Sequence, residues 1–123
     1  MSVKAVKKKV TNKVVISSFF KTISIDGRTE QVTVTVRRTL FFDNEERFPF
    51  FMIRRIEVAR EALDSVPDNY IRYVVFLHLT DGRNIIVDEV GESSVRGGLR
   101  EMKNLGKKIS AITSKELKLC EDS

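Results

Sequence analysis

The side chains best suited to acid–base or nucleophilic chemistry are few in this sequence and lie apart. His78 is the one histidine and Cys120 the one cysteine among 123 residues. His78 stands between two leucines in a strand-like run, where a histidine is more often a half-buried packing residue than a general base or metal ligand. A lone cysteine cannot form an intramolecular disulfide, and no base lies near Cys120 in the sequence to activate its thiol. Neither residue predicts a catalytic centre.

Glycines and carboxylates supply no alternative centre. Gly97-Gly98 lacks the spacing of the phosphate-binding glycine motifs. Asp88 and Glu89 are neighbours on one predicted strand, so their side chains point to opposite faces. The acidic stretch 43–46 has neither the ligand spacing nor the glycine of a calcium loop. We therefore predict a protein that is not an enzyme and that uses no metal or cofactor.

Cations form two groups that could bind anions. Residues 1–13 contain five lysines and no acid, which accounts for the whole net charge of +5. Residues 1–12 are predicted to be a basic flexible arm that either attracts an anionic bilayer or nucleic acid or only solubilises the chain. A predicted C-terminal helix adds a stripe of cations at helical spacing, which is either a binding surface or an ordinary solvated face. The candidate anion-binding residues are Lys4, Lys7, Lys8, Lys9, Arg96, Arg100, Lys103 and Lys107.

An aromatic cluster is the second candidate interaction site. Three phenylalanines and a methionine surround Pro49, which excludes a central strand and suits the first turn of a helix. We predict a short helical or irregular segment that plugs one end of a sheet. The alternative is an exposed patch for a protein partner or a membrane. The candidate patch residues are Phe48, Phe50, Phe51 and Met52.

The central element that positions these groups is a predicted hairpin at residues 71–90. Asp81-Gly82 separates two runs rich in β-branched and aromatic residues, which is a strong hairpin signal. The first run, 71–79, is apolar on much of both faces and is typical of a strand inside a core. An amphipathic helix is predicted from Val95 to Ile112, with Ser93 or Ser94 as its N-cap, beginning either before or after the glycine pair.

The preceding half of the chain is predicted to contain three strands. Residues 14–25 form the first, with a bulge or bend near Ser17-Ser18 where the apolar face changes. Asp26-Gly27 is predicted to turn the chain, with positive φ available at the glycine. Residues 31–43 alternate clearly, with threonines outward and Val32, Val34, Val36, Leu40 and Phe42 inward. A turn at 43–46, a third strand at 53–60 and a loop at 59–69 complete this half.

About five antiparallel strands followed by one amphipathic helix predict an α+β fold, a strongly bent antiparallel sheet or half-open barrel closed by the C-terminal helix. The stretches FPFFMIRRIEV, YVVFLHLTDGRNIIVDEV and LREMKNLGKKISAITSKEL resemble bacterial pleckstrin-homology-like (PH-like) domains over about residues 37–117. This resemblance implies a half-open barrel and a binding or scaffolding role. The predicted organisation is a basic arm at 1–12, a single PH-like domain at 13–117 and a polar tail at 118–123.

Two functional hypotheses remain open from the sequence. The first is a non-enzymatic binding or assembly module whose partner is another protein or a second copy of the chain. The second is an electrostatic binder of membrane lipid head groups or nucleic acid, which uses the lysine arm and the helix stripe and weakens with salt. No apolar run approaches the roughly 18 to 20 residues that cross a bilayer, and no apolar export signal follows the basic N-terminus. A cytoplasmic location is therefore expected.

Overall fold

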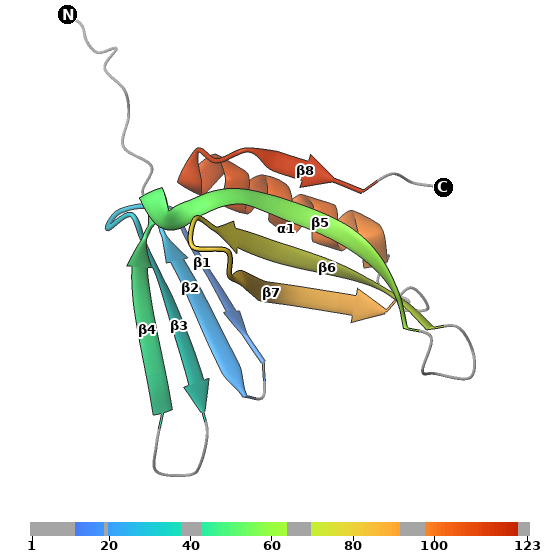
Figure 1. Ribbon diagram of the computed structural model, residues 1–123, viewed down its shortest axis with the longest axis horizontal. Coiled ribbons are helices and arrows are strands. Elements are labelled where there is room, and N and C mark those ends of the chain that lie inside the picture. The colour runs from blue at the N-terminus through green and yellow to red at the C-terminus, as the bar shows by residue number, and fades with distance from the viewer. Residues whose placement is uncertain (1–11, 19, 38–42, 64–69, 92–97, 121–123) are drawn as a thin grey trace, which may run out of the picture. The chain divides into compact units, whose positions relative to one another are not determined.

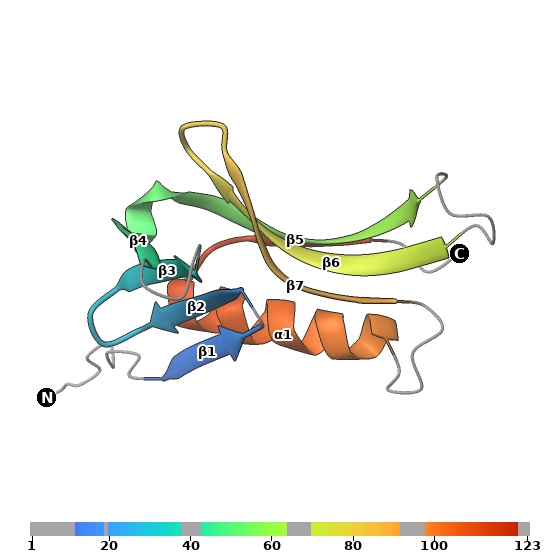
Figure 2. The ribbon, with the colours of Figure 1, turned by 90° about the horizontal axis from the view of Figure 1, so that it is seen from below.

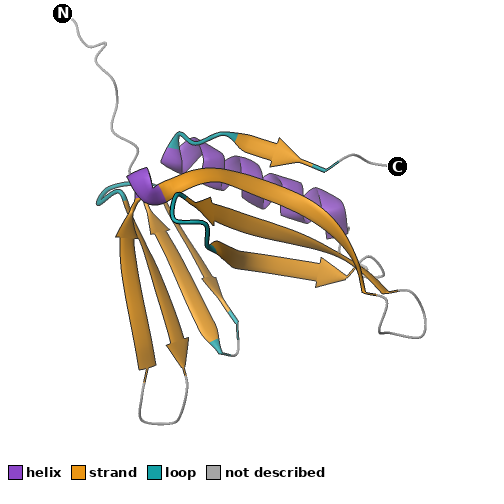
Figure 3. Ribbon diagram, viewed as in Figure 1, coloured by secondary structure: helices purple, strands orange, loops and turns teal. Residues whose placement is uncertain are grey.

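The computed structural model describes residues 12–18, 20–37, 43–63, 70–91 and 98–120. Contacts divide the chain into two compact units, Met1–Phe50 and Phe51–Ser123. The described residues form an α+β protein with two four-stranded sheets and one C-terminal α-helix (Figure 1, Figure 3). The predicted α+β class and the C-terminal helix are confirmed. The described residues contain more strands than the five predicted, and these strands form two sheets instead of one bent sheet.

The first unit is an antiparallel meander in which each strand pairs with the next in the chain. Its strands are β1 (Lys13–Ser17), β2 (Lys21–Asp26), β3 (Gln31–Arg37) and β4 (Asp43–Pro49). The order in the sheet is β1-β2-β3-β4. Alternation along the strands places apolar side chains on one face, and the buried ones are Val14, Ile23, Ile25, Val32, Val34 and Phe48. Threonine and serine side chains occupy the opposite face.

The prediction of one strand over residues 14–25 is wrong, because the chain reverses between β1 and β2. Ser17 pairs with Thr22, and the backbone N–H of Ser18 donates to the carbonyl of Lys21 (2.7 Å). The reversal explains why the apolar face changes near Ser17-Ser18, which the sequence analysis attributed to a bulge or bend. The sequence SSFFK contains no Gly, Pro, Asn or Asp, so it carries none of the usual turn signals.

The turn between β2 and β3 lies where it was predicted but has a different backbone. Asp26 pairs with Gln31, and the carboxylate of Asp26 accepts a hydrogen bond from the backbone N–H of Arg28 (2.9 Å). The positive φ falls on Glu30 (57°), not on Gly27 as predicted. Gly27 is buried, and its N–H donates to the carbonyl of Asn12 (2.9 Å).

The predicted turn at residues 43–46 is also wrong, because these residues begin β4. They pair with the end of β3, from Arg37 opposite Asp43 to Val34 opposite Glu46. The predicted inward residues Leu40 and Phe42 lie outside the described residues. Asn44, Glu45, Glu46 and Arg47 are exposed, so backbone pairing at a sheet edge, and not hydrophobic burial, makes this segment a strand. The predicted short helical segment follows as a 3₁₀ helix, η1 (Phe50–Met52).

The second unit contains the predicted central hairpin and the helix. Its elements after η1 are β5 (Ile53–Leu63), β6 (Tyr70–Leu79), β7 (Asn84–Gly91), α1 (Gly98–Thr113) and β8 (Leu117–Leu119). The sheet order is β7-β6-β5-β8, with β8 parallel to β5 and the other pairs antiparallel. The hairpin at 71–90 is confirmed. The third predicted strand extends to Leu63 instead of Arg60, and β8 was not predicted, because residues 118–123 were predicted to be a polar tail.

The β6–β7 turn follows from its Asp-Gly pair. Gly82 has φ of 93°, a conformation that costs glycine little. The carboxylate of Asp81 accepts hydrogen bonds from the backbone N–H of Arg83 (3.0 Å) and from its Nε (3.0 Å). The backbone hydrogen bond from Arg83 is the main reason why the pKa of Asp81 lies below its ordinary value.

Helix α1 covers one face of the second sheet (Figure 2). Its predicted apolar stripe is confirmed at Met102, Ile109 and Ile112, which are buried, whereas Val95 lies outside the described residues. The described part of the helix begins at Gly98, the second glycine of the pair, and the predicted N-cap residues Ser93 and Ser94 lie outside the described residues. The closest approach of the helix to the sheet is at Gly106: a Cβ there would lie 2.8 Å from Cγ2 of Val58 and 3.1 Å from Cδ1 of Leu117.

The sheet face opposite α1 is held together by two polar ties, each spanning β5, β6 and β7. Arg72 donates to Glu61 on β5 (2.7 and 2.9 Å) and to Glu89 on β7 (2.7 Å). These hydrogen bonds, that of Glu61 first, raise the pKa of Arg72 above its ordinary value. The second tie is made by His78, which lies 2.6 Å from both Oε1 of Glu57 and Oδ1 of Asn84.

Replacing Arg72 with methionine should lower the free energy of unfolding by about 1–2 kcal/mol, because two carboxylates lose a shared, half-buried guanidinium. Arg83→Met is the matched control, since Arg83 pairs with one exposed carboxylate and should cost less than about 0.5 kcal/mol. Both tyrosines, Tyr70 and Tyr73, lie in the second unit and the chain has no tryptophan, so tyrosine fluorescence during urea unfolding reports this unit. Equal losses for the two variants would contradict the assigned role of Arg72.

Neither sheet closes on itself, so the described residues contain no closed barrel. Each sheet ends in two edge strands, β1 and β4 in the first unit and β7 and β8 in the second. These edges and the outer face of the first sheet are the surfaces on which a partner or ligand can be sought.

Candidate anion-binding site

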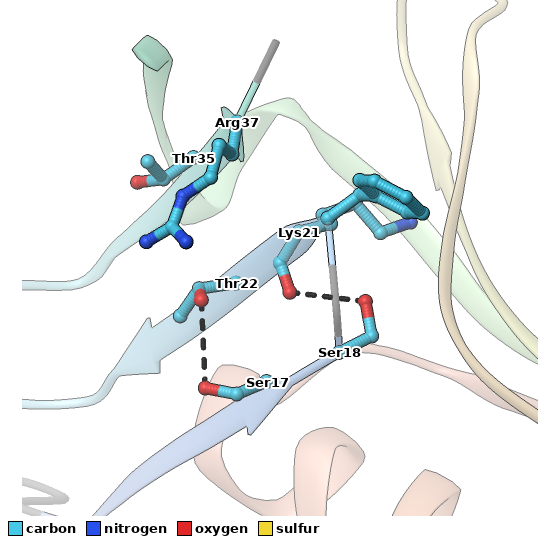
Figure 4. A pocket seen from close by; sticks show the side chains of 7 residues that line it. Ser17, Ser18, Lys21, Thr22, Thr35 and Arg37 are labelled. Atoms are coloured by element: carbon cyan, nitrogen blue, oxygen red, sulfur yellow. Dashed lines mark hydrogen bonds between the residues drawn. The ribbon is translucent and has the colours of Figure 1, made fainter. Parts of the chain in front are cut away.

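A pocket of about 310 Å³ lies at the β1–β2 turn of the first unit (Figure 4). It is formed by the end of β1, the start of β2 and the end of β3. Four of its lining side chains carry hydroxyls and two carry cationic groups. The lining residues are Ser17, Ser18, Phe20, Lys21, Thr22, Thr35 and Arg37. The volume is at the lower end of the range of about 300–1,000 Å³ for small-molecule sites.

Strand register places three of the hydroxyls in one row. Ser17 on β1 is opposite Thr22 on β2, and Thr22 is opposite Thr35 on β3. Oγ of Ser17 and Oγ1 of Thr22 lie 3.4 Å apart. Among the described residues, the side chain of Thr35 makes no hydrogen bond. Directly opposed residues on one face lie about 5 Å apart, so the row presents a line of hydroxyls across three strands.

Arg37 brings a positive charge to this row. Residues 35 and 37 share the outer face of β3, because side chains alternate along a strand. In Figure 4 the guanidinium of Arg37 extends on the side of Thr22 and Thr35. The backbone N–H of Arg37 donates to the carbonyl of Phe20 (2.8 Å), which joins the end of β3 to the β1–β2 turn.

The turn itself completes the pocket. The hydroxyl of Ser18 donates to the carbonyl of Lys21 (3.1 Å), a bond that closes the reversal next to the row. The side chain of Lys21 leads away from the Arg37 guanidinium in Figure 4, so Lys21 contributes its backbone and a more distant charge. Phe20 is 64% exposed, which leaves an aromatic ring open to solvent at the pocket.

The electrostatics of the pocket favour an anion. Among the described residues, no carboxylate lines it. Two acids of β4 lie opposite lining residues in the register, Asp43 opposite Arg37 and Glu45 opposite Thr35, and Oε2 of Glu45 accepts a hydrogen bond from Nε of Arg47 (2.7 Å). A guanidinium beside several hydroxyls offers hydrogen-bond donors and no negative charge, the combination that suits phosphate, sulfate or carboxylate oxygens.

The sequence-predicted cations lie elsewhere. Lys4, Lys7, Lys8, Lys9 and Arg96 fall outside the described residues. On α1, Arg100 and Lys107 are exposed and Lys103 is half-buried. The apolar stripe of α1 already packs on the sheet, so its outer surface can attract anions only through charge. Pocket residues Ser17, Ser18, Thr22, Thr35 and Arg37 were not predicted, since only strand pairing brings them together.

The predicted aromatic patch is largely buried. Phe48 is 3% exposed, Phe50 7%, and Met52 is half-buried, whereas Phe51 is 76% exposed. A continuous exposed aromatic surface therefore does not form within 48–52, and Phe51 is the member left open to a partner.

The residues considered for catalysis serve structural contacts. The ring of His78 lies between Glu57 and Asn84, with 17% of its side chain exposed, and contacts the ring of Phe76 (centroids 5.9 Å apart). The backbone N–H of Cys120 donates to the carbonyl of Val58 (2.9 Å) beyond the end of β8. Among the described residues, no group of three His, Cys, Asp or Glu side chains could hold a metal ion.

Comparisons with protein-family models, with curated proteins and with solved structures gave no match for this chain. Within the part of the chain that the structure describes, no helix has the length and apolarity needed to span a bilayer.

Proposed function

We propose that this protein is a non-enzymatic binding module that holds a phosphate-type oxyanion in the pocket at the β1–β2 turn. The observation that carries the proposal is the row of Ser17, Thr22 and Thr35 hydroxyls beside the Arg37 guanidinium, in a pocket that no carboxylate of the described residues lines. Arginine presents donors in a planar fork that matches two oxygens of a phosphate, and hydroxyls can donate to the remaining oxygens. None of these groups is a base or nucleophile suited to turnover, which supports binding without catalysis.

The pocket could bind the oxyanion of several kinds of molecule. A lipid head group, a nucleic-acid backbone and a small phosphate ester share the chemistry that the pocket recognises. Phe20, exposed at the pocket, offers a surface for an apolar or aromatic part of the same ligand. Exposed Arg100, Lys107 and Lys108 on α1 add to the attraction for an anionic partner at low ionic strength.

The proposal also includes a PH-like fold and a cytoplasmic location. Two open sheets, antiparallel except for the short β8, and a C-terminal helix preceded by the Asp81-Gly82 hairpin support a PH-like half-open barrel. A single cysteine supports residence in the cytoplasm, where disulfides are rare. Because one fold hosts many functions, the ligand is assigned from the pocket and not from the fold.

Arg37→Gln should weaken oxyanion binding at least about tenfold, because it removes the charged fork and keeps a polar side chain of similar reach. Binding is measured by NMR titration with O-phosphoethanolamine at constant ionic strength, following the amide signals of Ser17, Thr22 and Thr35. Arg28→Gln is the matched control: Arg28 is an exposed arginine of the same unit, in the β2–β3 turn, and its loss should leave affinity unchanged. Equal affinities for wild type and Arg37→Gln would refute the proposed site.

The source of the oxyanion is separated by three parallel arms with the same pair of variants. One uses phosphatidylcholine vesicles with and without phosphatidic acid, one a single-stranded oligonucleotide, and one the soluble ester. If the protein binds either the phosphatidic acid vesicles or the oligonucleotide more tightly than the soluble ester, and Arg37→Gln removes that difference, the tighter ligand is the source of the oxyanion. Binding that Arg37→Gln and Arg28→Gln reduce equally would reflect general charge attraction and would contradict the pocket.

A further inference from the structure

The free edge of β1 differs from every other sheet edge among the described residues. Edge strands invite pairing with another chain unless charge, proline, bulges or short length protect them. β4 places Glu46 opposite Val34, on the apolar face, and ends in Pro49. β7 is interrupted where its pairing with β6 shifts between Val75 and Phe76, and β8 has three residues. β1 has none of these features between its terminal lysine and serine.

The backbone of β1 points a defined set of groups at this free edge. The carbonyl of Asn12 accepts from Gly27, and the N–H of Ser18 donates to Lys21, so residues 12 and 18 bond toward β2. An antiparallel ladder alternates at every residue, so Val14 and Ile16 also bond toward β2. Lys13, Val15 and Ser17 therefore direct both their N–H and their C=O groups away from the sheet, and all three residues are exposed.

The sequence of this edge is complementary to itself about Val15. A second β1, antiparallel and related by a two-fold axis at Val15, would set Val15 against Val15, Val14 against Ile16, and Lys13 against Ser17. In this register every outward N–H and C=O of the strand meets a partner. Apolar side chains meet apolar ones on both faces, and no like charges are opposed. Val15, 53% exposed, would be covered by its own copy.

We propose that two copies of this chain pair through β1 and join their first sheets into one continuous sheet across a two-fold axis. The interface is isologous, so each copy uses the same edge and the assembly closes as a dimer. A second copy is the partner of the β1 edge, because β1 can pair with itself in a complementary register and the other described edges are protected against pairing.

The dimer has a consequence for the oxyanion pocket, and this part rests on the proposed function. Ser17 lines the pocket, and in the two-fold register its new neighbour is Lys13 of the second copy. Lys13 and Ser17 share the outer face of β1, so the added ammonium extends the row that runs through Thr22 and Thr35. The second copy thereby supplies a cation on the side of the row opposite Arg37. Oxyanion affinity and dimer formation should be coupled.

The first experiment measures mass by sedimentation equilibrium over a wide concentration range. Wild type should show a concentration-dependent dimer that is little affected by salt, because backbone pairing and apolar contact hold it. Val15→Glu places two carboxylates against each other and should be monomeric. The matched control is Thr33→Glu, at a half-buried residue on the same face but inside the sheet, and it should remain dimeric. A monomeric wild type, or a dimer insensitive to Val15→Glu, would overturn the interface.

Cross-linking tests the register. In a Cys120→Ser background, Val15→Cys should oxidise rapidly to a covalent dimer, since opposed residues in a hydrogen-bonded pair have Cα atoms about 5.5 Å apart, within disulfide range. Thr33→Cys in the same background should remain monomeric on a non-reducing gel. Equal cross-linking of the two variants would exclude pairing about Val15.

A double-mutant comparison tests the shared pocket. Lys13→Gln should weaken O-phosphoethanolamine binding several-fold in the wild-type background and have no effect in the Val15→Glu background, where no second copy is present. An equal effect in both backgrounds would show that Lys13 acts within its own chain and would refute the shared site. The proposed function fails separately, through Arg37→Gln, whether or not the dimer forms.

Discussion

Replacing Gly106 with alanine is expected to lower the free energy of unfolding by about 1–2 kcal/mol, although alanine is the better helix former. The new Cβ would lie 2.8 Å from Cγ2 of Val58, a fully buried and β-branched side chain that cannot turn away cheaply. It would also lie 3.1 Å from Cδ1 of Leu117 on β8. The helix would therefore have to move away from the sheet at the point where the two are closest.

Urea unfolding followed by tyrosine fluorescence measures this loss, because Tyr70 and Tyr73 both belong to the second unit. Asn104→Ala is the matched control: Asn104 is exposed on the same helix, so the substitution should leave stability unchanged or raise it slightly. A more stable Gly106→Ala protein would contradict the tight contact between α1 and β5.

Removing the last strand should have the larger effect. A chain ending at Lys115 loses β8, together with the hydrogen bonds from the N–H of Ile56 to Glu116 (2.9 Å) and from the N–H of Cys120 to Val58 (2.9 Å). It also loses Leu117, which packs beside Gly106. With about 1 kcal/mol for each hydrogen bond and a further contribution from the leucine, the expected loss is about 2–4 kcal/mol.

The same fluorescence measurement compares this truncation with a chain ending at Cys120, which keeps all of β8 and should unfold like the full-length protein. If the two truncations were equally stable, β8 would add nothing to the sheet, and the dispensable segment would begin at residue 116, before the predicted polar tail at 118–123. The expected difference identifies β8 as part of the second core.

The proposed β1–β1 pairing and oxyanion pocket connect the two functional hypotheses from the sequence, assembly and anion binding. Assembly was first attributed to the aromatic cluster, but Phe48 and Phe50 are buried, so that route depends on Phe51 alone. Anion binding was attributed to the lysine arm and to α1. In the proposed dimer, Lys13 of one copy adjoins Ser17 of the other, and self-association strengthens oxyanion binding instead of competing with it.

Elements with strong local signals were predictable from the order of the residues. Asp81-Gly82 fixed the central hairpin, because a glycine takes positive φ at little cost and the flanking runs are strongly β-forming. The 3.6-residue spacing of Met102, Ile109 and Ile112 fixed the helix and the face that it buries. The α+β class follows from these two features together.

The remaining strands and the pocket depend on tertiary structure, because the stability gained by pairing two strands does not depend only on the residues of one of them. The chain reverses between Ser18 and Lys21 without the usual turn residues, and β4 carries the charges of a loop yet pairs with β3 through its backbone. β8 is too short to show a periodic pattern of apolar residues, and it is a strand because its backbone pairs with β5. The pocket has the same origin: Ser17, Thr22 and Thr35 are distant in sequence, and only the register of three strands sets their hydroxyls in a row beside Arg37.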